Sequence, residues 1–326
     1  MTTGRVRVQI PASTANLGPG FDCLGMALNL YAWIDMELAH TTRIELFGDG
    51  MEGVPLDKTN LVYEVAQMVF AEAGEQHPEL YIGMYSDIPL TRGLGSSASA
   101  IVGALVAANA LIDNKLTDDQ LFQIASRLEK HPDNVGASLF GGIVVAYWDG
   151  ERAEYIRLTP HPDMAVLVAI PSFQLATEKA RNVLPQHVPL GEAVYNLSHS
   201  SLLVAALATG NLGMIRHAMQ DRLHQPHRAA LIPGMAEFLA GASEHGALGA
   251  ALSGAGPTVL ALVDARSNSK EQLEAFLRST FHQHQVEVEI RWLLPEGRGA
   301  EVIEDHTSLA SLAERMSAVS IDRGSY

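Results

Sequence analysis

The sequence contains few basic residues, few aromatic residues and a single cysteine. It has 22 Lys and Arg residues and 37 Asp and Glu residues, which gives a formal net charge of −15 at pH 7, and aromatic residues make up 6% of it. Nucleic-acid-binding proteins need a basic patch, and single-strand binders also need aromatic stacking platforms. We therefore expect no nucleic-acid partner. Cys23 has no second cysteine with which to form an internal disulfide.

Long apolar runs are also missing. Residues 98–112 form the longest mostly apolar stretch, and Ser99, Gly103 and Asn109 interrupt it. A membrane-spanning helix needs about 20 apolar residues, and the first residues lack the continuous apolar run of a secretory signal. These absences predict a soluble, cytoplasmic protein without a membrane partner. At about 150 residues per domain, the length of 326 residues predicts two domains.

The N-terminal third contains one strand pattern and one helix pattern. Residues 5–10 alternate polar and apolar side chains, which predicts a strand that Pro11 ends. Glycine and proline in residues 11–20 then predict a loop. Residues 98–112 are apolar almost all round, as in a fully buried helix.

Strands and helices are mixed along the rest of the chain. Thr117 and Gln120 form a capping box that starts a helix, and Pro132 stops it. This mixture predicts an α+β fold. Further strands are predicted at 143–147, 165–170 and 286–292 and on both sides of a glycine loop within 247–263, and further helices near 191–209, near 234–245 and after Ser269. We assign residues 1–160 to an N-terminal domain, 161–304 to a C-terminal domain, and 305–326 to a tail with a helix that frays at its end.

The loop Gly93-Leu94-Gly95-Ser96-Ser97-Ala98, before the predicted buried helix, carries the strongest chemical signal. The first four N–H groups of a helix lack partners within it, and a buried helix cannot give them to bulk water. Glycines let the backbone bend around a ligand, hydroxyls can bind a metal, and the helix dipole favours an anion. The loop therefore predicts a phosphate site. The alternative is that Ser96 or Ser97 only caps the helix.

Two common phosphate-binding motifs fit this loop less well. The chain contains no Gly-Lys pair, so a Walker A loop is absent. Gly93, Gly95 and Ala98 match the spacing of the dinucleotide fingerprint, and Asp113 lies where a ribose-binding acid would be. The preceding residues 87–92 are not an apolar strand, however, and the fingerprint requires one. We therefore disfavour a dinucleotide site.

Six segments between residues 11 and 258 together point to a family. They are PASTANLGPGFD at 11–22, PLTRGLGSSA at 89–98, HPDN at 131–134, TEKAR at 177–181, DRLHQP at 221–226 followed by Arg228, and SGAGPT at 253–258. These segments resemble, in the same order, those of the GHMP kinases and, within that family, of its homoserine kinase branch. The departures are small. Ser13-Thr14 replaces the more usual Thr-Ser, Lys130 replaces Gly and Ser99 replaces Ala, and none of these removes a group that the chemistry needs.

The resemblance implies a fold and a reaction. It implies an N-terminal domain like the second domain of ribosomal protein S5, a ferredoxin-like C-terminal domain, and ATP and substrate bound between them. The reaction implied is transfer of the γ-phosphoryl group of ATP to the side-chain hydroxyl of L-homoserine, giving O-phospho-L-homoserine for threonine biosynthesis. It also implies Mg²⁺ as cofactor and a homodimer. The alternatives are another GHMP kinase, acting on a sugar or an isoprenoid alcohol, and a GHMP-fold binding protein without catalysis.

The resemblance also assigns residues to ATP and the metal. The family's ATP loop corresponds to Pro89, Leu90, Thr91, Arg92, Gly93, Leu94, Gly95, Ser96, Ser97, Ala98 and Ser99, and Asn60 matches a segment near the adenine. Ser97 and Glu129 match the Mg²⁺ ligands. The position of Glu129 in the last turn of its predicted helix agrees, since the dipole disfavours a carboxylate there by up to about 1 kcal/mol and a cation would offset this. The alternative is a solvated glutamate beside Lys130.

By the same resemblance, Asn16, Asp22 and Asp133 face the amino acid, and Arg181 and Arg228 face its carboxylate and the phosphate. A planar guanidinium binds a carboxylate through two hydrogen bonds, which lysine cannot do. Taken singly, each arginine would be interpreted as a solvated surface residue, and only its place in a matching segment reverses that interpretation. Two arginines beside an Asn and Asp segment favour a zwitterionic amino acid over a sugar or an isoprenoid alcohol.

Three further side chains, those of Asn134, His131 and Cys23, are considered for a catalytic role. Asn134 stands near the position where mevalonate-type relatives have an aspartate general base, and an amide cannot take a proton at neutral pH. Our hypothesis is that Asn134 orients the hydroxyl or a phosphate oxygen and that no side-chain base is needed. His131 is either a base or a histidine bonded within its own loop. We disfavour Cys23 as a nucleophile because no cationic residue adjoins it in sequence.

Overall fold

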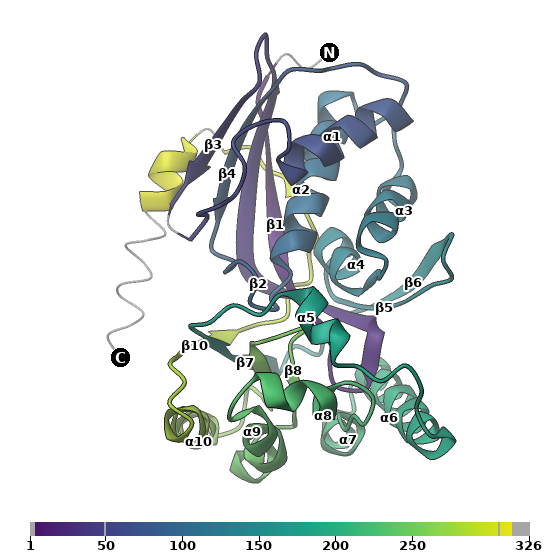
Figure 1. Ribbon diagram of the computed structural model, residues 1–326, viewed down its shortest axis with the longest axis vertical. Helices are drawn as coiled ribbons and strands as arrows, with labels where there is room; N and C mark the ends of the chain where they lie inside the picture. The colour runs from purple at the N-terminus through teal and green to yellow at the C-terminus, as the bar shows by residue number, and fades with distance from the viewer. Residues whose placement is uncertain (1–3, 49, 306, 315–326) are drawn as a thin grey trace.

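The computed structural model describes residues 4–48, 50–305 and 307–314, which form two β-sheets covered by helices. Figure 1 shows the two sheets one above the other, with the chain crossing from the upper to the lower one. The upper sheet contains β1 (Val6–Asn16), β2 (Gly20–Leu38), β3 (Arg43–Phe47), β4 (Leu80–Ser86), β5 (Ile143–Trp148), β6 (Ala153–Leu158) and β11 (Glu301–Val302).

The strands of the upper sheet have the order β11-β1-β2-β4-β3, and β5 joins the first part of β2 and carries β6. Only β3 and β4 pair in parallel within this sheet, as far as the structure describes the chain. Four helices lie on one of its faces (Figure 1): α1 (Leu61–Glu72), α2 (Ser96–Leu111), α3 (Asp118–Glu129) and α4 (Asp133–Phe140). Helix α2 packs directly on β1 and β2. Its Gly103 permits that approach, because a Cβ there would lie 2.7 Å from Ile10 and from Ile34.

The lower sheet has four antiparallel strands in the order β10-β7-β9-β8. They are β7 (Met164–Pro171), β8 (Gly249–Leu252), β9 (Val259–Asp264) and β10 (Val288–Leu293). Numbered by chain position the order is 4-1-3-2, which is the ferredoxin-like arrangement. The helices of this half are α5 (Thr177–Asn182), α6 (Leu190–Thr209), α7 (Leu212–Ala218), α8 (Gln225–Arg228), α9 (Met235–Gly241) and α10 (Lys270–Gln283), with 3₁₀ turns at Ala229–Leu231 and Ala242–His245. The prediction of an α+β fold is confirmed.

The prediction for the N-terminal strand is wrong in its length. Strand β1 does not end at Pro11 but continues to Asn16, and β2 begins at Gly20, so most of the predicted loop over 11–20 is strand. The pairing of β1 with β2 shifts register between Pro11 and Ala12. A bulge is one of the few places where a sheet tolerates proline, because the missing N–H then costs no ladder hydrogen bond.

Most of the other predicted elements are confirmed. Helix α2 occupies the predicted buried stretch, starting two residues earlier, and residues on all its sides are buried. Helix α3 starts with the predicted capping box, in which the Thr117 hydroxyl accepts from the Gln120 N–H and the Gln120 side chain accepts from the Thr117 N–H. Ser269 precedes α10 as expected, but its side chain makes no capping hydrogen bond.

The C-terminal part of the chain returns to the upper sheet. Strand β11 pairs with β1, and a helix over residues 309–314 lies on the sheet face opposite α1–α4 (Figure 1). The predicted tail over 305–326 therefore begins with a helix, and its remainder from 315 lies outside the described residues.

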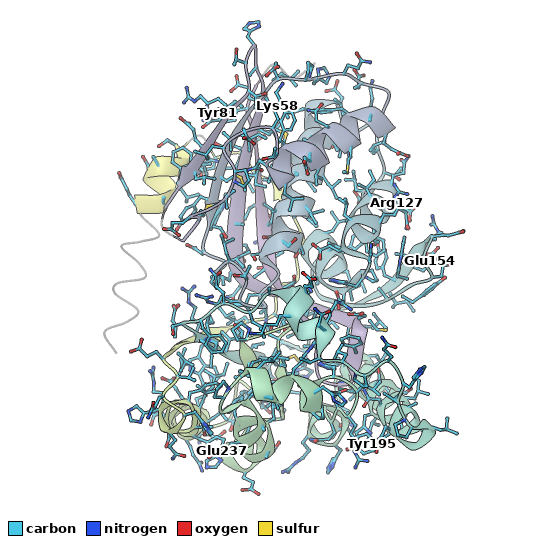
Figure 2. The ribbon with its side chains drawn as sticks, viewed as in Figure 1. Lys58, Tyr81, Arg127, Glu154, Tyr195 and Glu237 are labelled. Carbon is cyan, nitrogen blue, oxygen red and sulfur yellow. The ribbon has the colours of Figure 1, made fainter. Side chains whose placement is uncertain are left out.

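Charged side chains such as Lys58, Glu154 and Glu237 lie on the outer surface, far from one another (Figure 2). Among the described residues, no helix combines the length and the apolar character that crossing a membrane requires.

Candidate active site

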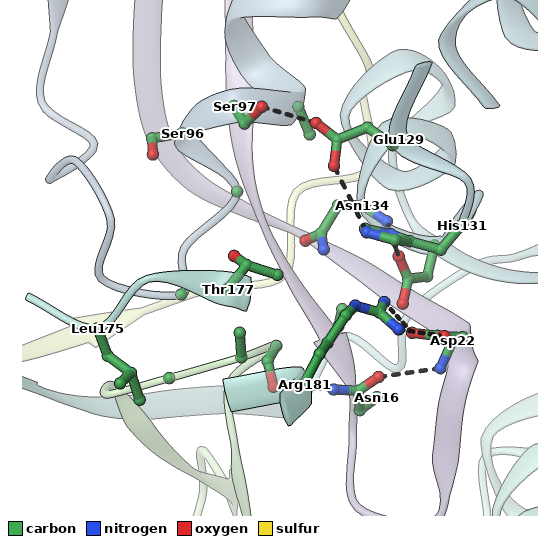
Figure 3. Close-up of a pocket in the computed structure, with 18 of the residues that line it drawn as sticks. Asn16, Asp22, Ser96, Ser97, Glu129, His131, Asn134, Leu175, Thr177 and Arg181 are labelled. Carbon is green, nitrogen blue, oxygen red and sulfur yellow. Dashed lines mark hydrogen bonds and ion pairs between the residues drawn. The ribbon is translucent and has the colours of Figure 1, made fainter. Parts of the chain in front are cut away.

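A polar cleft lies where the two sheets meet, with about 740 Å³ of open space. Its walls come from both halves of the molecule: the turn between β1 and β2, the N-terminus of α2, the end of α3 and the start of α4 on one side, and α5, α8 and the loop between β8 and β9 on the other. Figure 3 shows the side chains that point into it. Of the predicted site residues, the cleft brings together Asn16, Asp22, Thr91, Gly93, Gly95, Ser96, Ser97, Ala98, Glu129, His131, Asp133, Asn134, Arg181 and Arg228.

The N-terminus of α2 opens into this cleft. Its N-cap is Gly95, in the left-handed conformation with φ +73°, and no side chain caps the helix. The Ser99 hydroxyl donates to the Ser96 carbonyl, so it does not cap the helix either. A Cβ at Gly95 would lie 2.1 Å from the Ser13 hydroxyl oxygen, so both its backbone conformation and its surroundings require glycine. The alternative that Ser96 or Ser97 caps the helix is therefore wrong, and the first-turn N–H groups are available to an anion.

A second, largely apolar cavity adjoins the cleft, with about 920 Å³ of open space, and both are lined by Thr91, Ser96 and Ser97. Its other walls include Leu90, Ser99 and Asn60. Asn60 is 1% exposed, and both polar atoms of its side chain are hydrogen-bonded within the protein. Its Oδ1 accepts from the Val62 N–H and its Nδ2 donates to the Pro55 carbonyl. Asn60 therefore caps α1 at the wall of this cavity.

Three residues of the predicted ATP loop line neither cavity. Pro89 belongs to the lining of neither, and Leu94 is fully buried in the core. The Arg92 guanidinium donates to the Ser172 carbonyl at 2.6 Å, which links the loop to the lower half of the molecule. These residues shape the loop rather than face the open space.

Ser97 and Glu129 form the first link in a chain of polar contacts. The Ser97 hydroxyl donates to Glu129 Oε1 at 2.6 Å, and Glu129 Oε2 lies 3.5 Å from His131 Nε2 (Figure 3). The Glu129 side chain is only 16% exposed, so the alternative of a solvated surface glutamate is wrong. Lys130 ends α3 in the left-handed conformation, where glycine is favoured, and turns the chain toward the cleft.

His131 is bonded within its own loop. Its Nδ1 lies 3.0 Å from Asp133 Oδ1, which also accepts from the Asn134 N–H at 2.7 Å. Burial lowers the pKa of His131, but the hydrogen bond that the imidazole donates to Asp133 and the charges of Asp133 and Glu129 outweigh it, so the pKa is raised above its usual value. A histidine that holds its proton more tightly is a poorer general base at neutral pH. The interpretation of His131 as a loop-bonded residue is the one that this geometry favours.

The Asn134 amide is held in one orientation. Its Oδ1 accepts from the Ser13 hydroxyl at 3.0 Å, and the Ser138 hydroxyl donates to Ser13 at 3.1 Å. Because its oxygen is engaged, Asn134 presents its Nδ2 donor to the cleft. A donor can orient an oxygen atom but cannot remove a proton.

Across the cleft, Arg181 of α5 and Asp22 of β2 form a bidentate ion pair that joins its two walls. Arg181 Nη2 donates to Asp22 Oδ1 at 2.8 Å and Nη1 donates to Oδ2 at 3.0 Å (Figure 3). Asn16 supports the aspartate, since its Oδ1 accepts from the Asp22 N–H and its Nδ2 donates to the Gly254 carbonyl. Neither arginine is a plain surface residue, because Arg181 is paired and Arg228 is 1% exposed.

Arg228 reaches the cleft from below, through the core of the lower half. Its Nε donates to the Ala180 carbonyl at 3.0 Å, and its Nη1 donates to the Gly254 carbonyl at 3.1 Å. Burial and the neighbouring Arg181 lower the pKa of the Arg228 guanidinium to about 10, so it remains charged at neutral pH. The Gly254 N–H also donates to the Ala15 carbonyl. The glycine loop between β8 and β9 thus contacts the end of β1.

Sequence reasoning missed several residues of the cleft. The ring of Phe21 lies near both guanidinium groups, with its centroid 5.6 Å from the Cζ of Arg181 and 5.3 Å from the Cζ of Arg228. Thr177 and Leu175 also line the cleft. The position of Phe21 directly before Asp22 was the one available signal for it. Cys23 is exposed, and desolvation together with the charges of Asp133 and Asp22 raises the pKa of its thiol, which argues further against a nucleophile.

The described residues include no group of three His, Cys, Asp or Glu side chains placed to hold a metal ion. Mg²⁺ is often held by only one or two carboxylates, with substrate phosphates and water completing an octahedral shell. The Ser97 hydroxyl and the Glu129 carboxylate, beside the open end of α2, offer oxygen atoms that fit that pattern.

Comparison with known proteins agrees with this geometry. The family model for the N-terminal domain of the GHMP kinases matches residues 60–142, and the model for their C-terminal domain matches residues 203–283. The homoserine kinase of Desulfitobacterium hafniense is 46% identical over 91% of this chain and all of its own length, and that of Carboxydothermus hydrogenoformans is 44% identical over 90% and 96%. The crystal structure of homoserine kinase from Cytophaga hutchinsonii superposes with a TM-score of 0.84 at 27% identity, covering 93% of this chain and 98% of that one. The chain therefore belongs to the GHMP kinase family and, within it, to the homoserine kinase branch.

Proposed function

We propose that the cleft between the two sheets transfers the γ-phosphoryl group of ATP to the side-chain hydroxyl of L-homoserine, giving O-phospho-L-homoserine. One observation carries this proposal. The uncapped N-terminus of α2 lies where an apolar cavity and a polar, charged cleft meet. A nucleotide that placed its base in the first and its phosphates at the helix would present the γ-phosphate to the second. The family of the chain supports the same reaction.

The loop before α2 and the residues beside it would bind the triphosphate. Backbone N–H groups of the first turn of α2 are aimed at an anion, and the helix dipole adds to their attraction. The Ser97 hydroxyl and the Glu129 carboxylate would hold Mg²⁺. When bound, this cation neutralises negative charge on the phosphate oxygens. The apolar cavity that includes Leu90 and Asn60 would take the adenosine.

Charged side chains from both walls of the cleft would bind the two ends of the amino acid. Asp22 offers a carboxylate to the ammonium group, and Asp133 adds a second, since its Oδ2 has no hydrogen-bond partner among the described residues. Arg181 and Arg228 offer guanidinium donors to the substrate carboxylate. Binding would then replace the Arg181–Asp22 ion pair with one contact to each end of the substrate.

The phosphoryl transfer itself needs positioning more than covalent help from the protein. Asn134 can donate to the attacking hydroxyl or to a phosphate oxygen, because Ser13 fixes its amide. His131 holds Asp133 and Glu129 in place and, with its raised pKa, is not the base. We propose that the hydroxyl proton leaves to a phosphate oxygen or to solvent. We further propose, from the family resemblance, that the enzyme works in the cytoplasm as a homodimer.

A coupled assay of ADP release tests the reaction. L-homoserine, L-serine, L-threonine and mevalonate are offered in parallel with ATP, with and without Mg²⁺. We expect the highest kcat/KM with L-homoserine and no release above background without a divalent cation. Release with mevalonate but not with L-homoserine would show another GHMP kinase, and no release with any acceptor would show a binding protein.

A further inference from the structure

A buried histidine that does not line the cleft contacts two parts of the substrate site at once. His224 is fully buried at the N-cap of α8. Its Nε2 lies 2.7 Å from the Gly18 carbonyl oxygen, in the turn between β1 and β2, and its Nδ1 lies 3.2 Å from Arg228 Nη1. The imidazole also stacks on the ring of Phe21, with the centroids 5.0 Å apart.

The two partners fix the protonation of the ring. A carbonyl oxygen can only accept, so Nε2 carries the hydrogen, and a guanidinium can only donate, so Nδ1 carries a lone pair. The imidazole is therefore neutral with one defined tautomer. A proton on Nδ1 would point at the positive charge of Arg228 and remove the acceptor for its Nη1.

The charges around His224 act in both directions. Burial and Arg228 lower the pKa of the imidazole, while Asp221 and Asp22 raise it, and the net direction is downward. Asp221 Oδ2 lies 3.6 Å from Nε2, but the Asp221 carboxylate is already engaged by the backbone N–H groups of Leu223, His224 and Gln225. It is thus poorly placed to hold a second proton on the ring.

One guanidinium nitrogen of Arg228, Nη2, makes no hydrogen bond to the described residues. Its Nε is engaged by the Ala180 carbonyl, and its Nη1 by the Gly254 carbonyl and by His224. Among the described residues Nη2 has no hydrogen-bond partner, and Arg228 lines the cleft. The orientation of the fork, and hence the direction in which Nη2 points, depends on the acceptor at Nδ1 of His224.

We propose that His224 is a positioning residue for substrate binding, which as the neutral Nε2–H tautomer aims Arg228 into the cleft and ties it to the turn that carries Asn16 and Asp22. The inference rests on the proposed function for the identity of the substrate. It extends that function by a residue that touches neither substrate nor nucleotide. Glutamine can replace both hydrogen bonds, with its carbonyl toward Arg228 and its amide toward Gly18, whereas leucine can replace neither.

Steady-state kinetics of two variants test the role. We expect His224→Leu to raise the KM for L-homoserine by about 10- to 100-fold, the effect of losing a hydrogen bond to a charged group, while the KM for ATP changes by less than about twofold. We expect His224→Gln to recover most of the loss. His245→Leu is the matched control, because His245 also stacks on a phenylalanine, whereas its partners, Phe276 and the Gly241 carbonyl, do not line the cleft. An unchanged KM for L-homoserine in His224→Leu, or an equal rise in both KM values, overturns the proposal.

Nitrogen-15 NMR of histidine in the wild-type protein tests the tautomer without any variant or substrate. We expect His224 to keep a hydrogen on Nε2 and none on Nδ1 from pH 8 down to pH 5.5. An imidazolium, or the opposite tautomer, within that range overturns the inference. A wild-type enzyme that is inactive on L-homoserine but shows this tautomer would instead contradict the proposed function alone.

Discussion

The raised pKa of His131 links the protonation of one side chain to the stability of the fold. Asp133 and Glu129 favour the imidazolium in the native state, whereas a histidine in the unfolded chain titrates near pH 6.5. The native state therefore holds this proton more tightly. Its contribution to stability is fully present below about pH 6.5 and is lost as the pH rises through the native pKa.

We therefore expect His131→Gln to lower the free energy of unfolding relative to the wild type at pH 6, and the difference to shrink toward pH 9. Urea unfolding at both pH values measures it. His282→Gln, at an exposed position on α10, is measured alongside as the control for the loss of a histidine away from the cleft. A gap between wild type and His131→Gln that is constant, or that grows with pH, would contradict the assignment of the charged form to the native state.

Single residues of the site could be predicted from the sequence only where their chemistry is local. Gly95 and Ser97 stand in a glycine-serine loop before an apolar helix, and this pattern alone indicates an anion site. The contact of Phe21 with Arg228 and that of His224 with Gly18 each join segments some 200 residues apart in the chain. No spacing rule reports such a contact, so these residues could only be found in the structure.

At the scale of elements, the pattern of apolar residues predicted the helices and strands whose side chains are buried on all sides or at strictly periodic positions. Helix α2 is buried on all sides, and α3 has both its capping box and an apolar stripe. Strand β2 was not predicted, because it is partnered by β1 over its length and by β4 and β5 over different parts, so most of its residues are buried irrespective of alternation. The same burial hid the continuation of β1 beyond Pro11.

The helix over residues 309–314 covers one wall of the apolar cavity from outside. Leu309 is 2% exposed and packs with Leu312 in a cluster around Trp33 and Tyr85, which stack on each other. Both aromatic residues also line the cavity proposed for adenosine. The helix therefore packs against the outer side of that wall and supports it, although no residue of the helix lines the cavity.

We expect Leu309→Ala to raise the KM for ATP several-fold with little change in kcat or in the KM for L-homoserine. The buried cavity that the substitution leaves costs about 2–5 kcal/mol, enough to detach a short terminal helix. Steady-state kinetics with each substrate varied in turn measure the effect. Leu277→Ala on α10 is the control, since it opens a similar cavity in the core of the lower half and lowers stability without moving the KM for ATP. Equal effects of the two variants would show that Leu309 acts through global stability alone.

At the scale of the whole molecule, the site exists only because the two halves meet. The Ser253 hydroxyl, in the loop of the lower half, donates to the Gly93 carbonyl in the upper half at 2.6 Å and lies at hydrogen-bond distance, 2.8 Å, from the Thr14 hydroxyl in β1. The strand order 4-1-3-2 of the lower sheet could not be predicted from apolar patterns, because they do not say which strands are neighbours. The family resemblance supplied that part of the fold, and the geometry of the cleft then followed from it.

The whole molecule is also strongly acidic, and its ligand is an anion. A net charge of −15 repels ATP at long range, whereas the helix N-terminus, Arg181 and Arg228 attract it only locally. The Debye length falls from about 30 Å at 10 mM salt to about 8 Å at 150 mM, so salt screens the distant charges more than those in the cleft. We therefore expect the association rate constant of a fluorescent ATP analogue, measured by stopped flow at constant Mg²⁺, to rise between these salt concentrations by less than about tenfold. Binding of L-homoserine, a zwitterion without net charge, should respond far less. A nucleotide association rate that falls with salt would mean that the local positive groups dominate the approach, and the net charge would then be irrelevant to capture.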